Sequence, residues 1–323
     1  MNITVVVPVR NEENSIRLLL RALLEQTLPP AEIIIVDGGS TDATQSLVEA
    51  HVRQHSHLHL IRETEALPGR GRNVGAAAAA NDWIAFTDAG VAPAHDWLAQ
   101  LAKAVRVDPE ADVVYGAWEP VTDTFFKECA AIAYGYVPNA EVDDTFIKSR
   151  AILSSLLRRS VWLAVSGFSE KLRSAEDLLF MQRIDEAGFK VSYAPGALVR
   201  WSMQPTLWLT FRRFVTYSRH NMLAGLWRQW QAPVLTRYCL LILGAAILFG
   251  LTSWWPIIAA GLFLLMLLAR AIVALARNRR RYPGGPVRNT LRLVVLVPLL
   301  AVIDAATISG VFAWLVGDKL RSA

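Results

Sequence analysis

Charged, amide and glycine residues gather just after several short apolar runs in the first third of the chain. The segments that contain them are residues 8–12, 37–42, 69–75 and 87–90, which read PVRNE, DGGSTD, GRGRNVG and TDAG. Carboxylates can accept hydrogen bonds from ribose hydroxyls or from a base N–H. Arginines and glycine-exposed amides suit a diphosphate. These residue types therefore indicate a site for an activated nucleotide.

The elements that must position these segments are alternating strands and helices. Apolar, mostly β-branched runs predict strands at Ile3–Val7, Glu32–Val36, Leu58–Ile61, Ile84–Thr87 and Val113–Tyr115. Two helices are predicted between the first three strands. The first is indicated by leucines and an isoleucine at helical spacing after residue 15, and the second begins at residues 40–42. This alternation predicts a parallel sheet with helices on both faces, and ligands then bind beyond the carboxyl ends of the strands.

Five motifs stand in one order along the chain: VVPVRNEE, VDGGSTD, GRGRNVG, FTDAG and SAEDLLF. Together they resemble glycosyltransferase family 2, over residues 1–194 and weakly to residue 226. The resemblance implies an α/β fold of the GT-A type, Rossmann-like with a mostly parallel sheet. It also implies transfer of a sugar from a nucleotide-sugar donor with inversion. Uridine is the family's commonest base, so a UDP-sugar is the expected donor.

The resemblance also assigns donor-binding residues. It places Pro8, Asn11 and Glu12 near the nucleobase and Asp37 on the base or ribose. It places Arg70, Arg72 and Asn73 near the ribose and the diphosphate. It places Asp88 beside the nucleotide sugar and its metal.

One position departs from the family pattern. Asp88 matches the first acid of the Asp-x-Asp motif, but Gly90 stands where the second acid, the usual metal ligand, is expected. Asp88 can hold Mg²⁺ or Mn²⁺ through waters, since Mg²⁺ uses one or two carboxylates together with phosphates. Alternatively, Arg70 and Arg72 neutralise the leaving diphosphate without a metal. The sequence leaves both alternatives open.

The acceptor-side base is expected in the SAEDLLF motif. The resemblance assigns this role to Asp177, with Glu176 as the alternative base or as a group that orients Asp177. Without the other motifs, an ordinary acidic helix start would be the better explanation of both acids, because Ser174 and Asp177 have a cap-like spacing.

The composition divides the chain in two. Hydrophobic residues make up 53% and charged residues 19%, with a net charge of +5 and two cysteines. No Asp or Glu occurs between Glu186 and Asp304, and the basic residues of this part flank long apolar runs. A nucleic-acid-binding protein would instead spread its basic residues over a polar face. The pattern of basic residues beside apolar runs is typical of a membrane protein. Two cysteines are too few for a disulfide scaffold.

Three membrane helices are predicted, at about residues 238–255, 257–276 and 293–316, and each is long enough for a hydrocarbon core about 30 Å thick. Residues 206–234 mix arginines with aromatics, which is typical of interfacial amphipathic helices. Residues 1–205 form the catalytic domain and residues 235–323 the membrane domain. Positive residues before the first helix and between the last two place the catalytic domain in the cytoplasm and the C-terminal tail on the far side. Asp304 is expected to bond another helix, with Arg270 as a candidate partner.

The sequence thus predicts an inverting glycosyltransferase integral to the plasma (inner) membrane. Its acceptor is expected to be a hydroxyl or phosphate of a lipid or lipid-linked molecule. One rival is a non-catalytic nucleotide-sugar-binding scaffold, suggested by Gly90. Another is a polymerising synthase, disfavoured because Arg200-Trp201 lacks the Gln of a Gln-x-x-Arg-Trp segment. The histidines between residues 51 and 59 are expected to be solvated rather than metal-bound.

Overall fold

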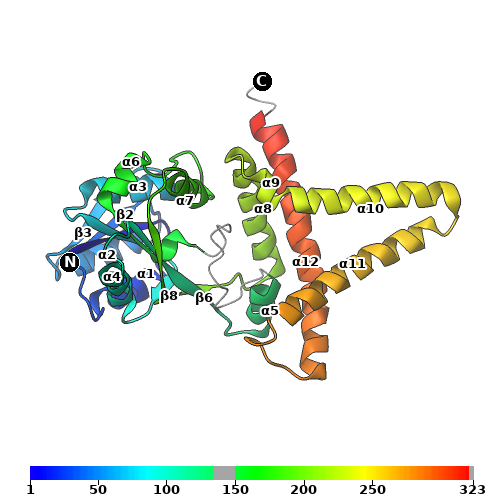
Figure 1. The fold of residues 1–323 in the computed structure, drawn as a ribbon, viewed down its shortest axis with the longest axis horizontal. Coiled ribbons are helices and arrows are strands. Elements are labelled where there is room, and N and C mark those ends of the chain that lie inside the picture. Colours follow the sequence, from blue (N-terminus) through cyan, green and yellow to red (C-terminus); the bar gives the residue numbers. More distant parts are fainter. Residues whose placement is uncertain (134–149, 320–323) are drawn as a thin grey trace. The chain divides into compact units, whose positions relative to one another are not determined.

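The computed structural model describes residues 1–133 and 150–319 (Figure 1). The chain forms two compact units. The N-terminal unit comprises residues 1–120 and 139–202, and the C-terminal unit comprises residues 121–138 and 203–323. The expected domain boundary at residue 205 lies close to this division. Residues 121–138, expected in the catalytic domain, group instead with the C-terminal unit.

An eight-stranded sheet forms the centre of the N-terminal unit, in the order β3-β2-β1-β4-β7-β6-β8-β5. The strands are β1 Ile3–Val9, β2 Glu32–Asp37, β3 Leu58–Arg62, β4 Trp83–Phe86, β5 Val91–Pro93, β6 Val113–Val121, β7 Ser155–Arg158 and β8 Val191–Ser202. Strands β1 to β4 are parallel, whereas the pairs β4–β7, β6–β7 and β5–β8 are antiparallel. The predicted strands are confirmed, and the carboxyl ends of β1, β2 and β4 share one edge.

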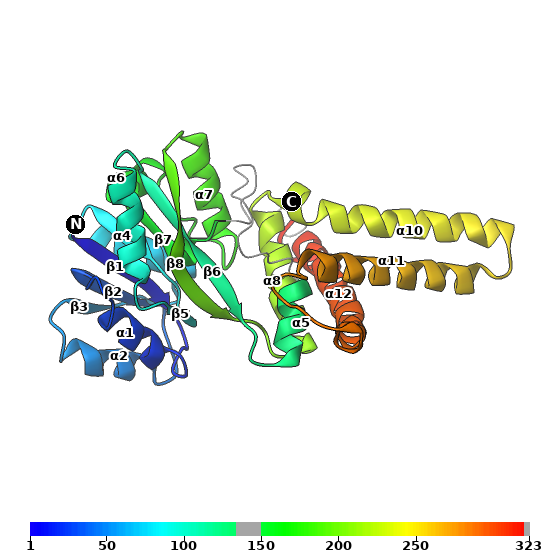
Figure 2. The ribbon, with the colours of Figure 1, turned by 60° about the horizontal axis from the view of Figure 1, so that its bottom comes forward.

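Helices cover both faces of this sheet (Figure 2). One face packs against α1 Ile16–Leu24, α2 Thr44–Val52 and α4 Trp97–Val107. The other packs against α3 Pro68–Ala78, α6 Arg159–Ala164 and α7 Glu176–Glu186. Successive residues of β1 alternate between the two cores, because side chains of a strand point to opposite faces. The predicted α/β fold with two helical layers is confirmed.

The glycine-rich segment 69–75 is helical, which corrects one expectation. Its residues form most of α3, and the Gly71 N–H donates to Leu67 O at 3.0 Å rather than facing a ligand. The glycines permit close packing instead. A β-carbon on Gly69 would lie 2.1 Å from Ser169 O, and one on Gly75 would lie 2.3 Å from Val6 Cγ1. Any larger side chain here would push α3 off the sheet.

The described part of the C-terminal unit is helical. It comprises α5 Phe125–Ala133, α8 Leu207–Leu223, α9 Trp227–Trp230, α10 Ala232–Leu251, α11 Trp255–Arg277, α12 Pro286–Trp314 and a π-turn at Leu315–Lys319. Helices α10, α11 and α12 with its π-turn are long and apolar enough to cross a membrane. Helices α10 and α11 lie side by side as the expected hairpin (Figures 1 and 2).

Helix α12 begins earlier than residue 293, and this corrects the place of two arginines. Arg288 and Arg292 were expected in the link before the third apolar helix, but both lie inside α12. The guanidinium of Arg292 is buried and donates to Glu128 of α5 at 2.7 Å. The pairing of Asp304 with Arg270 is confirmed: Arg270 Nη2 donates to Asp304 Oδ1 at 3.1 Å, and Asp304 is buried.

Candidate active site

Asp37 ends strand β2 with a fully buried carboxylate. Its Oδ1 accepts from the backbone N–H groups of Gly39 at 3.0 Å and Ser40 at 2.8 Å, and from Gln45 Nε2 at 2.8 Å. Its Oδ2 is buried and has no partner among the described residues. A buried acceptor without a donor is costly, so this oxygen is suited to a ligand's hydroxyl or N–H.

The segment after β1 is fastened to the segment after β2. Asn11 has a positive φ of 57°, and its Oδ1 accepts from Thr41 N at 2.8 Å. The Glu12 N–H donates to Thr44 Oγ1 at 2.7 Å. Pro8 lies beside α3, where a β-carbon on Gly71 would be 2.9 Å from Pro8 Cβ. These contacts hold the predicted nucleobase residues at the sheet edge, close to Asp37.

Arg72 joins two of the predicted functional segments. It is 3% exposed. Its Nη2 donates to Asp88 Oδ1 at 2.5 Å, and its Nη1 donates to Glu176 Oε1 at 2.7 Å. Its guanidinium lies 5.3 Å from the ring centre of Phe168. Although burial opposes it, the charges of Asp88 and Glu176 raise the pKa of Arg72, so this cation stays charged. Asp88, expected on the donor side, and Glu176, expected on the acceptor side, therefore share one buried guanidinium.

The two acids at the start of α7 have different surroundings. Glu176 is buried, and its Oε2 has no partner among the described residues. Asp177 is half-buried, and its Oδ1 accepts from Leu178 N at 2.8 Å. Burial and then the charge of Glu176 raise the pKa of Asp177 to about 7, against the effect of Arg72. A carboxylate with this pKa and partial access suits a general base near neutral pH.

The alternative that these acids belong to a Ser-capped helix start does not hold. Ser174 Oγ is buried and has no partner in residues 1–133 and 150–319, and the residue before the helix is Ala175, whose φ is +69°. A non-glycine residue in this left-handed conformation is uncommon and costs free energy. The strained turn sets the direction of Glu176 and Asp177, and no cap holds it.

Two predicted donor residues do not join the Arg72 cluster. Arg70 is exposed and pairs with Glu63 at 2.9 Å and Glu170 at 3.2 Å. The amide of Asn73 donates to Phe168 O at 2.9 Å and accepts from Trp162 Nε1 at 3.0 Å, so it positions the loop before α7. Phe168 and Glu170 had no signal in the sequence beyond their place ahead of the SAEDLLF motif.

The fit of a divalent cation depends on Asp88 and its surroundings. The Asp88 side chain is 32% exposed at the end of β4. Gly90 has a φ of +79°, and a β-carbon there would lie 3.6 Å from Glu12 Oε2. No cluster of three or more metal-ligating side chains occurs in residues 1–133 and 150–319. A site completed by a donor diphosphate needs only one or two carboxylates, so the residues present fit Mg²⁺ or Mn²⁺.

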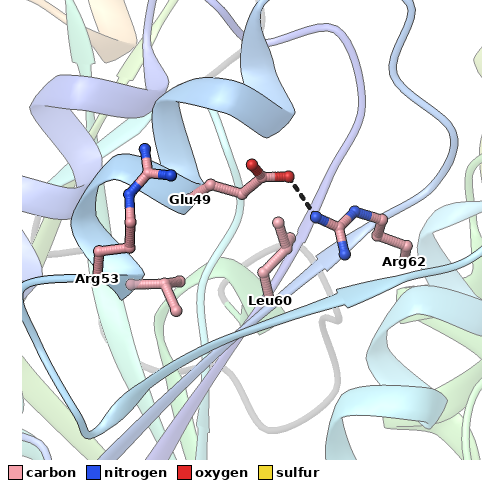
Figure 3. A pocket seen from close by; sticks show the side chains of 5 residues that line it. Glu49, Arg53, Leu60 and Arg62 are labelled. Carbon is pink, nitrogen blue, oxygen red and sulfur yellow. Dashed lines mark hydrogen bonds and ion pairs between the residues drawn. The ribbon is translucent and has the colours of Figure 1, made fainter.

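A shallow pocket lies elsewhere, between α2 and β3 (Figure 3). Glu49, Val52, Arg53, Leu60 and Arg62 line it, and Glu49 and Arg62 form an ion pair across it. None of these residues was predicted for the donor site. The histidines between residues 51 and 59 form no metal cluster in the described part of the chain.

Residues 4–149 match the family model of glycosyl transferase family 2. This segment is therefore a glycosyl transferase family 2 domain. It is 28% identical over 232 residues to the pre-mycofactocin glycosyltransferase of Mycobacterium tuberculosis, covering 66% of this chain and 46% of that protein. It is 29% identical over 224 residues to the O-antigen chain rhamnosyltransferase RfbN of Salmonella typhimurium, covering 66% and 70%. The chain thus spans about half the length of the mycobacterial relative.

Solved structures share the fold of this chain. The mannosyltransferase PcManGT of Pyrobaculum calidifontis, in complex with GDP-Man and Mn²⁺, superposes with a TM-score of 0.58 at 20% identity, over 98% of this chain and 88% of that one. S. aureus TarS 1–349 in complex with UDP gives 0.52 at 21% identity, over 100% and 92%. The predicted GT-A fold class is confirmed.

Proposed function

We propose that this family 2 member is a membrane-bound inverting glycosyltransferase that uses a nucleotide sugar. The observation that carries the proposal is Arg72, which joins Asp88 on the donor side to Glu176 beside Asp177. Relatives named as glycosyltransferases and neighbours in complex with UDP or GDP-Man support it.

The donor is proposed to bind across the ends of β1, β2 and β4. Asp37 Oδ2 accepts from the base or ribose, and Asn11 and Glu12 line the nucleobase side. Asp88 lies on the diphosphate side, next to the guanidinium of Arg72. In this arrangement the anomeric carbon lies toward α7, where the acceptor's base is placed.

Asp177 is proposed as the general base. It takes the proton of the acceptor hydroxyl while that oxygen attacks the anomeric carbon on the face opposite the diphosphate. The C–O bond to the diphosphate breaks in the same displacement, and the configuration inverts. Glu176 is held by Arg72 at 2.7 Å and is buried, so it orients the helix start rather than reaching the acceptor. An acceptor phosphate would need no base.

A divalent cation held by Asp88 would supply positive charge to the departing diphosphate. Within the protein, Arg72 supplies a fixed positive charge beside Asp88, preorganised before the reaction. Arg70 is bound to Glu63 and Glu170 at the surface, so it does not join Arg72 at Asp88.

The acceptor is proposed to be a lipid or a lipid-linked sugar. The support is the apolar surface of the C-terminal unit, where most side chains of α10 and the outer half of α11 are exposed. Basic residues at the inner end of the hairpin support a cytoplasmic position for the catalytic residues. Transfer to a soluble sugar but not to extracted lipids would contradict this part of the proposal.

A thermal-shift screen of the detergent-solubilised chain tests the proposed function. Nucleotide sugars with uridine or guanosine are added, each with Mn²⁺ or with chelator. A ligand at hundredfold excess over its Kd adds about 2.7 kcal/mol, a measurable shift. One donor is expected to stabilise the chain, and Asp37→Asn is expected to abolish the shift. If no donor shifts the melt, the proposal fails. A shift without turnover in any acceptor fraction favours the scaffold alternative.

A further inference from the structure

The carboxylate of Glu12 fills the space beside Gly90. A β-carbon on Gly90 would lie 3.6 Å from Glu12 Oε2 and 3.8 Å from Oε1. An acidic side chain at position 90 would therefore reach into the volume that this carboxylate now occupies. Strands β1 and β4, which precede Glu12 and Asp88, are hydrogen-bonded neighbours in the sheet. The two acids accordingly lie at adjoining strand ends.

Local bonds hold Glu12 in this position. Its N–H donates to Thr44 Oγ1 at 2.7 Å, and its carbonyl accepts from Ile16 N at 2.8 Å. The Ser15 hydroxyl donates to Glu12 Oε2. A carboxylate fixed in this way keeps its direction without a ligand, as a metal-binding side chain requires.

The charge around Arg72 also calls for a cation. Asp88, Glu176 and Asp177 act on the single buried guanidinium of Arg72, and a donor diphosphate would add more negative charge. Arg70 is engaged by two surface carboxylates instead. A divalent cation would offset this concentration of negative charge.

We propose that Glu12 supplies the carboxylate that Gly90 lacks, so that Glu12 and Asp88 together hold Mg²⁺ or Mn²⁺ with the donor's diphosphate. This inference rests on the proposed donor site, and it assigns the Glu12 carboxylate to the metal instead of the nucleobase. Two hard oxygen ligands plus phosphate oxygens are a usual set for Mg²⁺.

Binding of Mn²⁺ to the full solubilised chain tests the proposal, measured as loss of the free-Mn²⁺ electron paramagnetic resonance signal with UDP or GDP present. Glu12→Gln is expected to weaken Mn²⁺ binding at least tenfold. Adding Gly90→Asp to Glu12→Gln is expected to restore it. Adding Gly90→Asn instead is the matched control, since it places a similar side chain at the same positive φ without charge.

Unchanged Mn²⁺ affinity in Glu12→Gln, with loss of binding in Asp88→Asn, would overturn the proposal. Equal results for the two position-90 variants would overturn it as well. Nucleotide binding in chelator, read by thermal shift, separates this failure from failure of the donor site itself. If neither nucleotide binds under any condition, the proposed donor site is wrong, and the proposed role of Glu12 is refuted with it.

Helix α12 packs against two other helices, α8 and α5, and of these α8 is rich in arginine. Helix α8 packs beside its second half: Ser218 Oγ donates to Thr307 O at 2.7 Å, and Arg219 pairs with Asp318 at 2.7 Å. Helix α5 packs near its start, where Glu128 pairs with Arg292. In α8 alone, residues 212, 213 and 219 are arginines.

The α10–α11 hairpin meets α12 only at the inner end of the hairpin. Leu267 and Ala271 of α11 pack with Leu296 and Leu300 of α12. Farther out, hairpin side chains such as Leu243, Phe249 and Leu264 are exposed. Both views show the hairpin running crosswise to α12 (Figures 1 and 2).

We infer that only the α10–α11 hairpin crosses the bilayer, while α12 lies with α8 and α5 at the level of the lipid headgroups. If α12 crossed, the arginines of α8 would enter the hydrocarbon with it, at about 2.5–3.5 kcal/mol each near the centre. At the headgroups they stay in a polar layer whose anionic lipids attract basic helices, and Arg219 keeps its ion pair with Asp318. Helix α12 is then not the expected third membrane helix, and both of its ends lie on the same side of the bilayer.

Single cysteines labelled with a membrane-impermeant maleimide in sealed vesicles of known orientation test this arrangement. The background is Cys239→Ser, with Cys129 buried. Val287→Cys and Val316→Cys mark the two ends of α12, and Ser253→Cys marks the hairpin tip. The two α12 sites are expected to label from one side and Ser253→Cys from the other. Labelling of Val316→Cys from the side of Ser253→Cys would overturn the inference.

Discussion

Replacing Arg72 with Met is expected to disturb stability and pH dependence together. The guanidinium is 4% exposed and bonds Asp88 and Glu176, and the Glu176 side chain is itself only 5% exposed. Methionine fills a similar volume but leaves both carboxylates without their cation. Loss of one partner of a buried ion pair costs about 3–5 kcal/mol. The Asp88 side chain is 32% exposed and partly screened by water, so the lower end, about 3 kcal/mol, is expected.

Thermal unfolding of the solubilised chain measures this loss. For a domain of roughly 150–250 residues, 1 kcal/mol moves Tm by about 2–4 °C, which gives an expected fall of about 6–12 °C. Arg72 also opposes the rise in the pKa of Asp177. The variant's rate is therefore expected to rise with pH only above the range in which the wild-type rate rises.

Arg70→Met is the matched control. Arg70 lies in the same helix, but its pairs with Glu63 and Glu170 are solvent-exposed. Such pairs contribute less than about 1 kcal/mol. Adding Glu176→Gln to Arg72→Met is expected to recover part of the lost stability by removing one uncompensated charge. Equal effects of Arg72→Met and Arg70→Met would refute the role of the buried cluster.

Three further predictions concern single positions. The wild-type rate of transfer to a hydroxyl acceptor is expected to rise with pH through about 7, as Asp177 ionises; a flat profile between pH 5 and 9 would exclude that carboxylate as the base. Gly69→Ala is expected to lower stability by about 1–3 kcal/mol, because its β-carbon would meet Ser169 O at 2.1 Å; an unchanged melt would contradict the close packing of α3. Asp304→Asn is expected to destabilise the solubilised chain more than the double variant that also carries Arg270→Gln, since the single change leaves Arg270 unpaired, and thermal melts of both compare them.

Local patterns in the sequence predicted most of the catalytic fold. The β-branched runs and the leucine spacing of α1 gave the first strands and helices, because burial on a sheet face or helix face imposes those periods. The same alternation predicted the edge of the sheet that carries both Asp37 and Asp88. The pairing of Asp304 with Arg270 could also be predicted, since both are isolated charges in apolar helices.

Contacts between distant segments could not be predicted in the same way. Nothing local in the sequence indicates that the Glu12 carboxylate lies beside Gly90, or that Glu128 of α5 pairs with Arg292 of α12. The glycine-rich start of the helix at residues 68–78 was not predicted because three glycines disfavour a helix, whereas tight packing against β1 and the loop at Ser169 requires them. Tyr134 and Tyr136 are aromatic residues suited to an acceptor groove or to a core, and both lie outside the described residues.

Transfer of a labelled sugar from nucleotide-sugar donors into extracted membrane lipids tests the central claim most directly. The wild-type chain and Asp177→Asn are compared at pH 8, with Mn²⁺ present and donor binding verified for both. A lipid-soluble labelled product is expected from the wild-type chain with one donor, falling about 10²–10⁴-fold in the variant. Equal turnover by the two proteins, or no product from any donor that binds, would contradict the claim.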